Sequence, residues 1–171
     1  LGGWAISSAR PRALGWIVGA AFAVAAAVGL PAELAHDTFP RSPFDQAAAY
    51  LRDTLEPGDT ILHDNKLSYF PMIVYAPDLP QVFLPDEAGS HNDTLAPATQ
   101  EALEIFPLQG IARGVEGATR VRYVIFQRAI DEYAAATDGE PPALAWLKAR
   151  GMPAGVEVFN DLWIYEFLFD R

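Results

Sequence analysis

The chain contains no cysteine, which excludes disulfides, thiolate metal ligands and cysteine nucleophiles. It is also poor in basic residues, with 12 Lys and Arg against 22 Asp and Glu and a formal net charge of −10 at pH 7. Nucleic-acid binding needs Lys and Arg to neutralise phosphates, so we expect no nucleic-acid partner. The same acidic excess would be repelled by anionic lipid headgroups, which predicts a domain that stands off a membrane surface.

Familiar catalytic motifs are missing as well. No serine lies in a Gly-x-Ser-x-Gly elbow, and no glycine-rich segment has the spacing of a phosphate-binding loop. The loop from Pro85 to Pro97 holds oxygen and nitrogen donors, but their spacing matches no known metal-binding loop. The sequence therefore predicts no catalytic residue, no cofactor and no metal site.

One feature is unusually strong, a twenty-residue run from Ala13 to Ala32 without an ionisable side chain. As a helix it would be about 30 Å long, the thickness of a bilayer's hydrocarbon core, so we predict a transmembrane helix over 13–32. A signal peptide or a buried core helix are the alternatives. Arg10 and Arg12 lie just before the run, which places the N-terminal side in the cytoplasm and the following domain outside the cell membrane. Residues 1–12 then end a preceding loop or span.

Residues 33–41 form a short polar connector, and residues 42–171 are enough for one domain. Ser42 as a cap and Pro43 at the first helical position predict a helix that ends before the turn Glu56–Asp59. A strand over 60–63 follows, and a helix that begins near Pro71. Further along, the pattern predicts strands at 81–84 and 120–127, helices at 98–106, 129–136 and 142–150, and a hairpin at 156–167.

This alternation predicts an α/β domain of three layers, with a mostly parallel sheet and a C-terminal β-hairpin. Asn160 and Asp161 suit the tight turn of the hairpin, which we expect to close one edge of the sheet. Gly151 follows the helix at 142–150, where a left-handed conformation often ends a helix. The strand over 120–127 is nearly continuously apolar, so we expect it to be central.

The candidate ligand contacts cluster after the strand at 60–63. Asp64, Asn65 and Lys66 follow it, at the end of a strand where open α/β sheets often bind ligands. His63 and Asp64 are adjacent on the chain and so point to opposite faces, which argues against a catalytic pair and favours a structural histidine beside a turn. Tyr69 adds an aromatic ring, suited either to sugar stacking or to the core. His91, in the loop at 85–97, completes the substrate-binding candidates.

Several segments follow one another in a set order: the apolar run, then Phe44–Arg52, Glu56–Leu62, Tyr75–Pro77 and Phe159–Tyr165. This order resembles the C-terminal part of bacterial membrane glycosyltransferases of the GT-C fold, the group similar to dolichyl-phosphate-mannose protein mannosyltransferases. The resemblance implies a last transmembrane helix followed by an extracytoplasmic α/β domain. It also implies transfer of a sugar from a polyprenyl-phosphate donor to an extracytoplasmic acceptor.

In that family the catalytic carboxylate lies in the first outer loop, a part not present here, so the resemblance assigns no catalytic residue to this chain. Its partners would be the lipid bilayer and, through the N-terminal part, the lipid-linked sugar and the acceptor. Two other functions remain open. One is a single-pass, membrane-anchored extracytoplasmic binding or interaction subunit without activity. The other is a secreted α/β hydrolase, although no nucleophile motif supports it.

Overall fold

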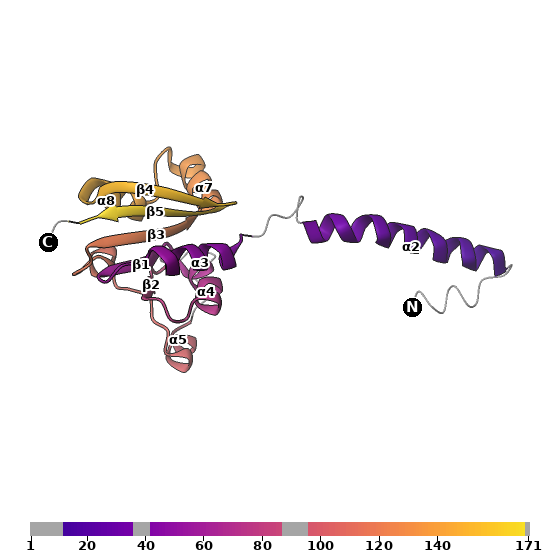
Figure 1. Ribbon diagram of the computed structural model, residues 1–171, viewed down its shortest axis with the longest axis horizontal. Coiled ribbons are helices and arrows are strands. Elements are labelled where there is room, and N and C mark those ends of the chain that lie inside the picture. The colour runs from indigo at the N-terminus through magenta and orange to yellow at the C-terminus, as the bar shows by residue number, and fades with distance from the viewer. Residues whose placement is uncertain (1–11, 36–41, 87–95, 170–171) are drawn as a thin grey trace. The chain divides into compact units, whose positions relative to one another are not determined.

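The computed structural model describes residues 12–35, 42–86 and 96–169 (Figure 1). The chain divides into two compact units, Leu1–Arg41 and Ser42–Arg171. The first unit contains helix α2, Arg12–Ala35, and the second contains the sheet and the remaining helices. We describe each unit by itself.

Helix α2 covers the apolar run, so the helix predicted there is confirmed. Among the residues that the structure describes, however, no helix is both long and apolar enough to cross a bilayer. That this helix crosses a membrane stays a prediction.

The second unit is an α/β domain, as predicted. Its sheet has the strand order β2-β1-β3-β5-β4. In chain order its elements are α3 (Phe44–Thr54), β1 (Asp59–His63), α4 (Lys66–Tyr75), β2 (Gln81–Phe83), α5 (Pro97–Leu103), α6 (Ile111–Gly114), β3 (Arg120–Phe126), α7 (Gln127–Thr137), α8 (Pro142–Arg150), β4 (Met152–Phe159) and β5 (Leu162–Leu168).

The sheet is mixed, which corrects the prediction of a mostly parallel one. β1 pairs in parallel with β2 and β3, but β5 pairs antiparallel with both β3 and β4. The reason is the C-terminal hairpin: its two strands are joined by a tight turn at Asn160, whose φ of 56° is left-handed, and β5 then pairs along the whole of β3. The hairpin and its position at one edge of the sheet are confirmed.

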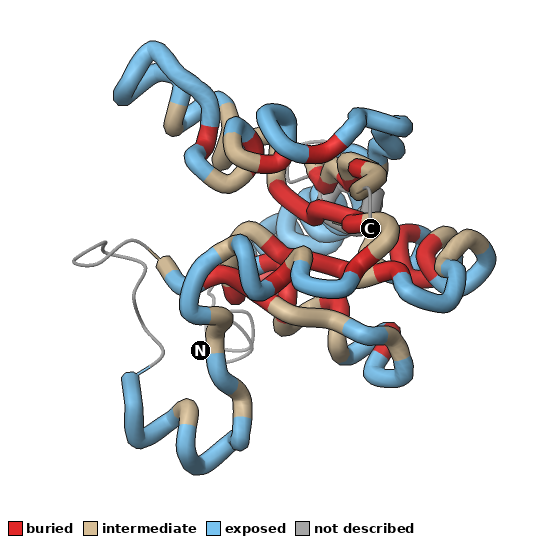
Figure 2. Tube along the Cα trace, turned by 90° about the vertical axis from the view of Figure 1, so that its left-hand side faces the viewer, coloured by how far each residue is buried: buried red, intermediate tan, exposed pale blue. Residues whose placement is uncertain are grey.

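Two apolar cores flank the sheet, and Figure 2 shows the buried residues concentrated along it. On one face Ala47, Ala48 and Leu51 of α3 and Met72 of α4 pack against the strands. On the other face Leu144 and Leu147 of α8 pack against them, with α6 and α7 alongside. Helices therefore cover both faces, and β3 between them is buried from Val121 to Ile125.

Two helix starts differ from the predictions. Ser42 does not cap α3; its hydroxyl donates instead to Asp161 Oδ1 at 2.5 Å, in the turn of the hairpin. Helix α4 begins at Lys66 and not near Pro71, because Asn65 Oδ1 accepts a hydrogen bond from Leu67 N at 2.8 Å and so caps it. The side-chain cap sets the start of α4, and Pro71 lies inside the helix.

Gly151 ends α8 without the left-handed conformation predicted for it, since its φ is −100°. Glycine is needed at this position because there is no room for a side chain. A Cβ atom there would lie 2.9 Å from Phe169 Cζ and 3.0 Å from Phe167 Cβ. The close approach of β5 to the end of α8 is therefore what demands glycine.

Gly151→Ala is expected to lower the free energy of unfolding by about 1–3 kcal/mol, because the added methyl group overpacks this contact. Urea denaturation of the whole chain measures the loss. Gly155→Ala in β4 is the matched control, since its Cβ would meet only Glu166 Oε2 at 3.8 Å, an ordinary contact. Equal stability of the two variants would contradict the explanation.

Candidate functional site

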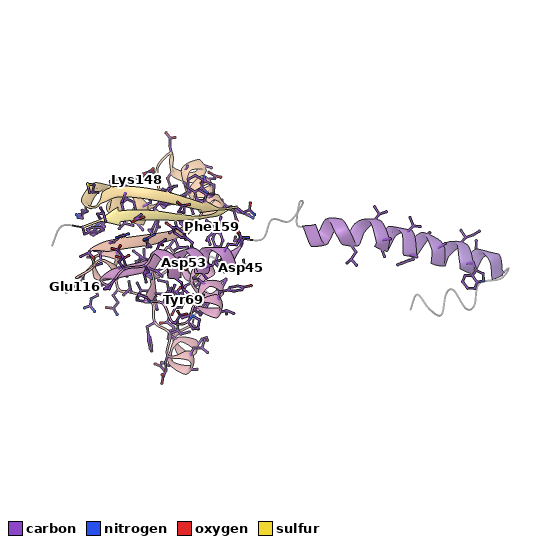
Figure 3. The ribbon with its side chains drawn as sticks, in the orientation of Figure 1. Asp45, Asp53, Tyr69, Glu116, Lys148 and Phe159 are labelled. Carbon is purple, nitrogen blue, oxygen red and sulfur yellow. The ribbon has the colours of Figure 1, made fainter. Side chains whose placement is uncertain are left out.

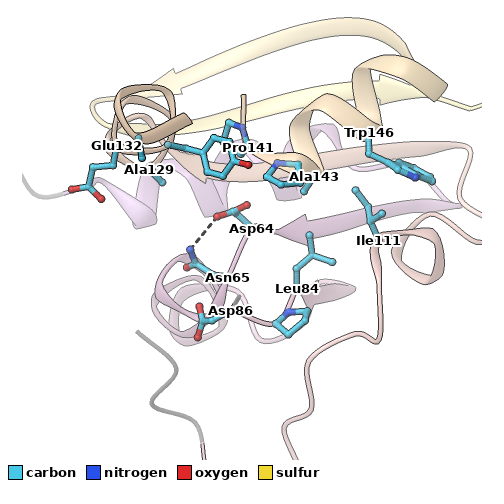
Figure 4. A pocket seen from close by; sticks show the side chains of 14 residues that line it. Asp64, Asn65, Leu84, Asp86, Ile111, Ala129, Glu132, Pro141, Ala143 and Trp146 are labelled. Carbon is cyan, nitrogen blue, oxygen red and sulfur yellow. Dashed lines mark hydrogen bonds between the residues drawn. The ribbon is translucent and has the colours of Figure 1, made fainter. Parts of the chain in front are cut away.

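A cavity of about 590 Å³ lies at the carboxyl ends of the parallel strands (Figure 4). Asp64 and Asn65 directly follow β1, and Leu84, Pro85 and Asp86 directly follow β2. Helices α7 and α8 supply the facing wall, and Ile111 of α6 closes one end. Crevices at this edge of an α/β sheet are common ligand sites, and the volume lies within the range of small-molecule pockets.

Asp64 is held in a fixed orientation inside this pocket. Its backbone N–H donates to Val124 O at 2.9 Å, which continues the pairing of β1 with β3. Its carboxylate accepts a hydrogen bond from the buried Tyr123 hydroxyl and another from Asn65 Nδ2 at 3.0 Å. Because Asn65 also caps α4, the Asp64–Asn65 pair is tied to a strand and a helix at once.

The Tyr123 phenol is a permanent donor to Asp64. Burial raises its pKa well above the usual value of a tyrosine, and the nearby Asp64 charge raises it further. The phenol therefore keeps its proton across the physiological range. Asp64 is thus presented to the pocket as an ionised acceptor with a donor behind it.

The two other carboxylates of the pocket each face a cation. Asp86 forms an ion pair with Lys66, the first residue of α4, and both side chains are largely buried, at 10% and 6% exposure. Glu132 of α7 lies 2.7 Å from Arg128 Nε, one helical turn away on the surface. The polar end of the pocket is thus rich in acceptors but carries little net charge from these two pairs.

The rest of the wall is apolar. Leu84 and Pro85 lie on the strand side, and Pro141, Ala143 and Trp146 lie on the side of α8. In Figure 4 the carboxylates gather toward one end, and Trp146 and Ile111 lie at the other. The Arg150 guanidinium lies 4.6 Å from the centre of the Trp146 ring, which stabilises the orientation of the indole.

His63 points away from the pocket, as its alternation with Asp64 predicts. Its ring lies between Ser68 Oγ at 3.2 Å and Gln81 Oε1 at 3.0 Å, and the side chain is fully buried. Burial lowers its pKa to about 4, although the Gln81 hydrogen bond acts in the opposite direction. His63 is therefore a neutral, structural residue at neutral pH.

Of the other candidates, Tyr69 stacks on Phe83 with ring centres 4.6 Å apart and meets His63 edge to face. It belongs to the α4 side of the domain and does not line the pocket (Figure 3). Lys66 contacts the site through its ion pair with Asp86. His91 lies outside the described residues. The structure thus brings together Asp64, Asn65 and, indirectly, Lys66.

Sequence reasoning missed the contribution of α7 and α8, in particular Glu132, Tyr133 and Trp146. The available signal was the strand at 120–127: α7 begins where β3 ends, so it must lie beside the same edge of the sheet as Asp64. The Trp146 ring, by contrast, comes from a helix with no local sign of a site.

The residue types of the described lining limit the chemistry that the pocket can perform. The described residues that line the pocket include no Ser, Thr, Cys, His or Lys that could act as a nucleophile or as a base beside one. The described residues also hold no group of three His, Cys, Asp or Glu side chains placed for a metal ion. Comparisons with protein-family models, curated proteins and solved structures give no match for this chain. Fold and pocket together define an α/β domain with a ligand pocket at the carboxyl edge of a mixed sheet.

Proposed function

We propose that the chain is the C-terminal part of a polytopic membrane glycosyltransferase, in which Ser42–Arg171 is a non-catalytic extracytoplasmic domain on the acceptor side. The full enzyme would transfer a sugar from a polyprenyl-phosphate donor to an extracytoplasmic acceptor. The observation that carries the proposal is the pocket: it offers fixed acceptors and apolar walls, and its described lining has no Ser, Thr, Cys, His or Lys. A domain of this kind binds an acceptor and leaves the chemistry to another part of the enzyme.

The charges around the pocket favour binding of the sugar acceptor over binding of the polyprenyl-phosphate sugar donor. A carrier phosphate needs Arg or Lys donors, but the ionisable side chains that line the cavity are Asp64, Asp86, Glu132 and Tyr133. The one lysine nearby, Lys66, is engaged by Asp86. The polyprenyl phosphate is therefore assigned to the part of the enzyme that precedes this domain.

Transfer assays with membranes that contain the full-length protein test the proposal. The 171-residue chain alone is expected to transfer no sugar. In the full-length protein, Asp64→Asn is expected to raise KM for the acceptor about tenfold and to leave kcat and the donor KM unchanged, because a hydrogen bond to a charged group stabilises by about 1.5–3 kcal/mol.

Two results would overturn it. Sugar transfer by the chain alone, or loss of kcat in Asp64→Asn, would place the chemistry in this domain. A full-length protein that has no further apolar segments and transfers no sugar would favour the membrane-anchored binding subunit instead.

A further inference from the structure

We infer that the pocket binds a neutral saccharide, with Asp64 accepting hydrogen bonds from its hydroxyl groups and Trp146 packing against its ring carbons. This inference rests on the proposed function, in that both take the pocket as the ligand site of the domain. It goes further in naming the chemical class of the ligand and the side chains that recognise it.

The hydrogen-bonding side chains favour a ligand that donates. Asp64 and Asp86 present carboxyl oxygens to the pocket, and these oxygens accept hydrogen bonds. Tyr123 and Asn65 fix Asp64 before any ligand arrives, which reduces the entropy that binding costs. Hydroxyl groups donate to such oxygens, whereas a phosphate or carboxylate ligand would be repelled by them.

The charges favour a neutral donor over a cation. Asp86 is paired with Lys66 inside the protein, and Glu132 is paired with Arg128 at 2.7 Å. At Asp86 and Glu132, an ammonium ligand would therefore meet carboxylates that neighbouring cations already neutralise, which leaves Asp64 as its main attraction. Neutral hydroxyl groups need hydrogen bonds and no net charge.

The apolar wall fits a sugar ring. A pyranose has polar edges and faces made of carbon-bound hydrogens, and such a face packs favourably on an aromatic ring. Trp146 lies beside Ile111 at the end of the pocket away from the carboxylates (Figure 4). A volume of about 590 Å³ leaves room for more than one sugar ring.

Titration of the isotope-labelled 171-residue chain with maltose, cellobiose and lactose, followed by NMR, tests the inference. The indole N–H signal of Trp146, assigned by its absence in Trp146→Phe, is expected to shift with at least one of these disaccharides. Asp64→Asn is expected to raise Kd about tenfold and Trp146→Ala about threefold to tenfold, whereas Trp146→Phe retains most of the affinity.

Asp53→Asn is the matched control. Asp53 is an exposed carboxylate on α3, which packs on the face of the sheet opposite α7 and α8 (Figure 3). Its Kd should equal that of the unchanged chain, and unchanged backbone spectra show that each variant is folded.

Glucose phosphate and putrescine serve as the anionic and cationic probes. If either shifts the Trp146 signal at lower concentration than every disaccharide, the assignment of a neutral ligand is wrong. If no disaccharide shifts it, the saccharide site is wrong. The transfer assay stays separate: saccharide binding without transfer by the full-length protein would refute the proposed function and leave this inference standing.

Discussion

Arg122→Met is expected to lower the free energy of unfolding by about 3–5 kcal/mol, because it removes one of the two arginines that neutralise Asp59 and Glu166. Arg122 lies in the middle of the sheet with 1% of its surface exposed. It donates to Tyr50 Oη at 3.0 Å and to Thr54 O at 2.9 Å. Its guanidinium also lies 3.5 Å from Glu166 Oε2 and 4.0 Å from Asp59 Oδ2.

The size of the expected loss follows from what remains after the substitution. Methionine fills much of the volume but donates no hydrogen bond, so the Thr54 carbonyl loses a donor. Asp59 and Glu166 keep Arg120, which lies 3.5 Å and 2.9 Å from them. Arg120 must then balance three carboxylates, because it also lies 2.7 Å from Glu56.

Arg128→Met is the control, because Arg128 forms a shorter ion pair, at 2.7 Å, but at 82% side-chain exposure. Solvent screens that pair, so its loss is expected to cost about 0.5 kcal/mol or less. Urea denaturation of both variants gives the comparison. A loss below about 1 kcal/mol in Arg122→Met would contradict the conclusion that the charged cluster of Asp59, Arg120, Arg122 and Glu166 stabilises the fold.

The charged cluster lies at the end of the parallel strands opposite the pocket. Asp59 and Arg120 begin β1 and β3, whereas Asp64 and α7 follow the carboxyl ends of the same strands. The same two strands therefore hold a closed ionic network at one end and an open acceptor-rich cavity at the other. Substitutions in the network are expected to act on stability, and those in the pocket on binding.

Much of the fold was predictable because its signals are local. The buried strand β3 is a nearly continuous apolar run, and Asn160 has the left-handed φ of 56° that its tight turn needs. The parallel order of the sheet was predicted wrongly because no local pattern encodes which strand β5 will pair with. That pairing joins residues such as Arg120 and Leu168, which are far apart on the chain.

The residues of the candidate site also fall into those that a local pattern predicts and those that it does not. Asp64 and Asn65 were found because a strand end followed by polar residues is visible in a short window of sequence. Glu132 and Trp146 were missed because nothing local in their helices indicates a site, and only the topology brings them to the same cavity. Tyr69 could not be assigned from the sequence, because a tyrosine suits both a binding platform and a core. In the structure it packs on Phe83.

Lowering the pH from neutral to about 4 is expected to remove about 3 kcal/mol of stability through His63 alone. The pKa of its imidazole is lowered from 6.5 to about 4 in the folded chain, chiefly by burial. Between these two values the unfolded chain binds the proton more readily than the folded chain does. Stability therefore rises with pH across this window, is complete above 6.5, and is lost as the pH falls toward 4.

His63→Gln isolates this contribution, because glutamine keeps polar groups for Ser68 and Gln81 but does not titrate. Carboxylates elsewhere act equally in both proteins, so the difference between the two curves of unfolding free energy against pH belongs to His63. As the pH falls from 6.5 to 4, the unchanged chain is expected to lose stability relative to His63→Gln, by about 3 kcal/mol in all. Parallel curves would mean that the buried ring is protonated as easily as in the unfolded chain, which is incompatible with an imidazole enclosed between β1, β2 and α4.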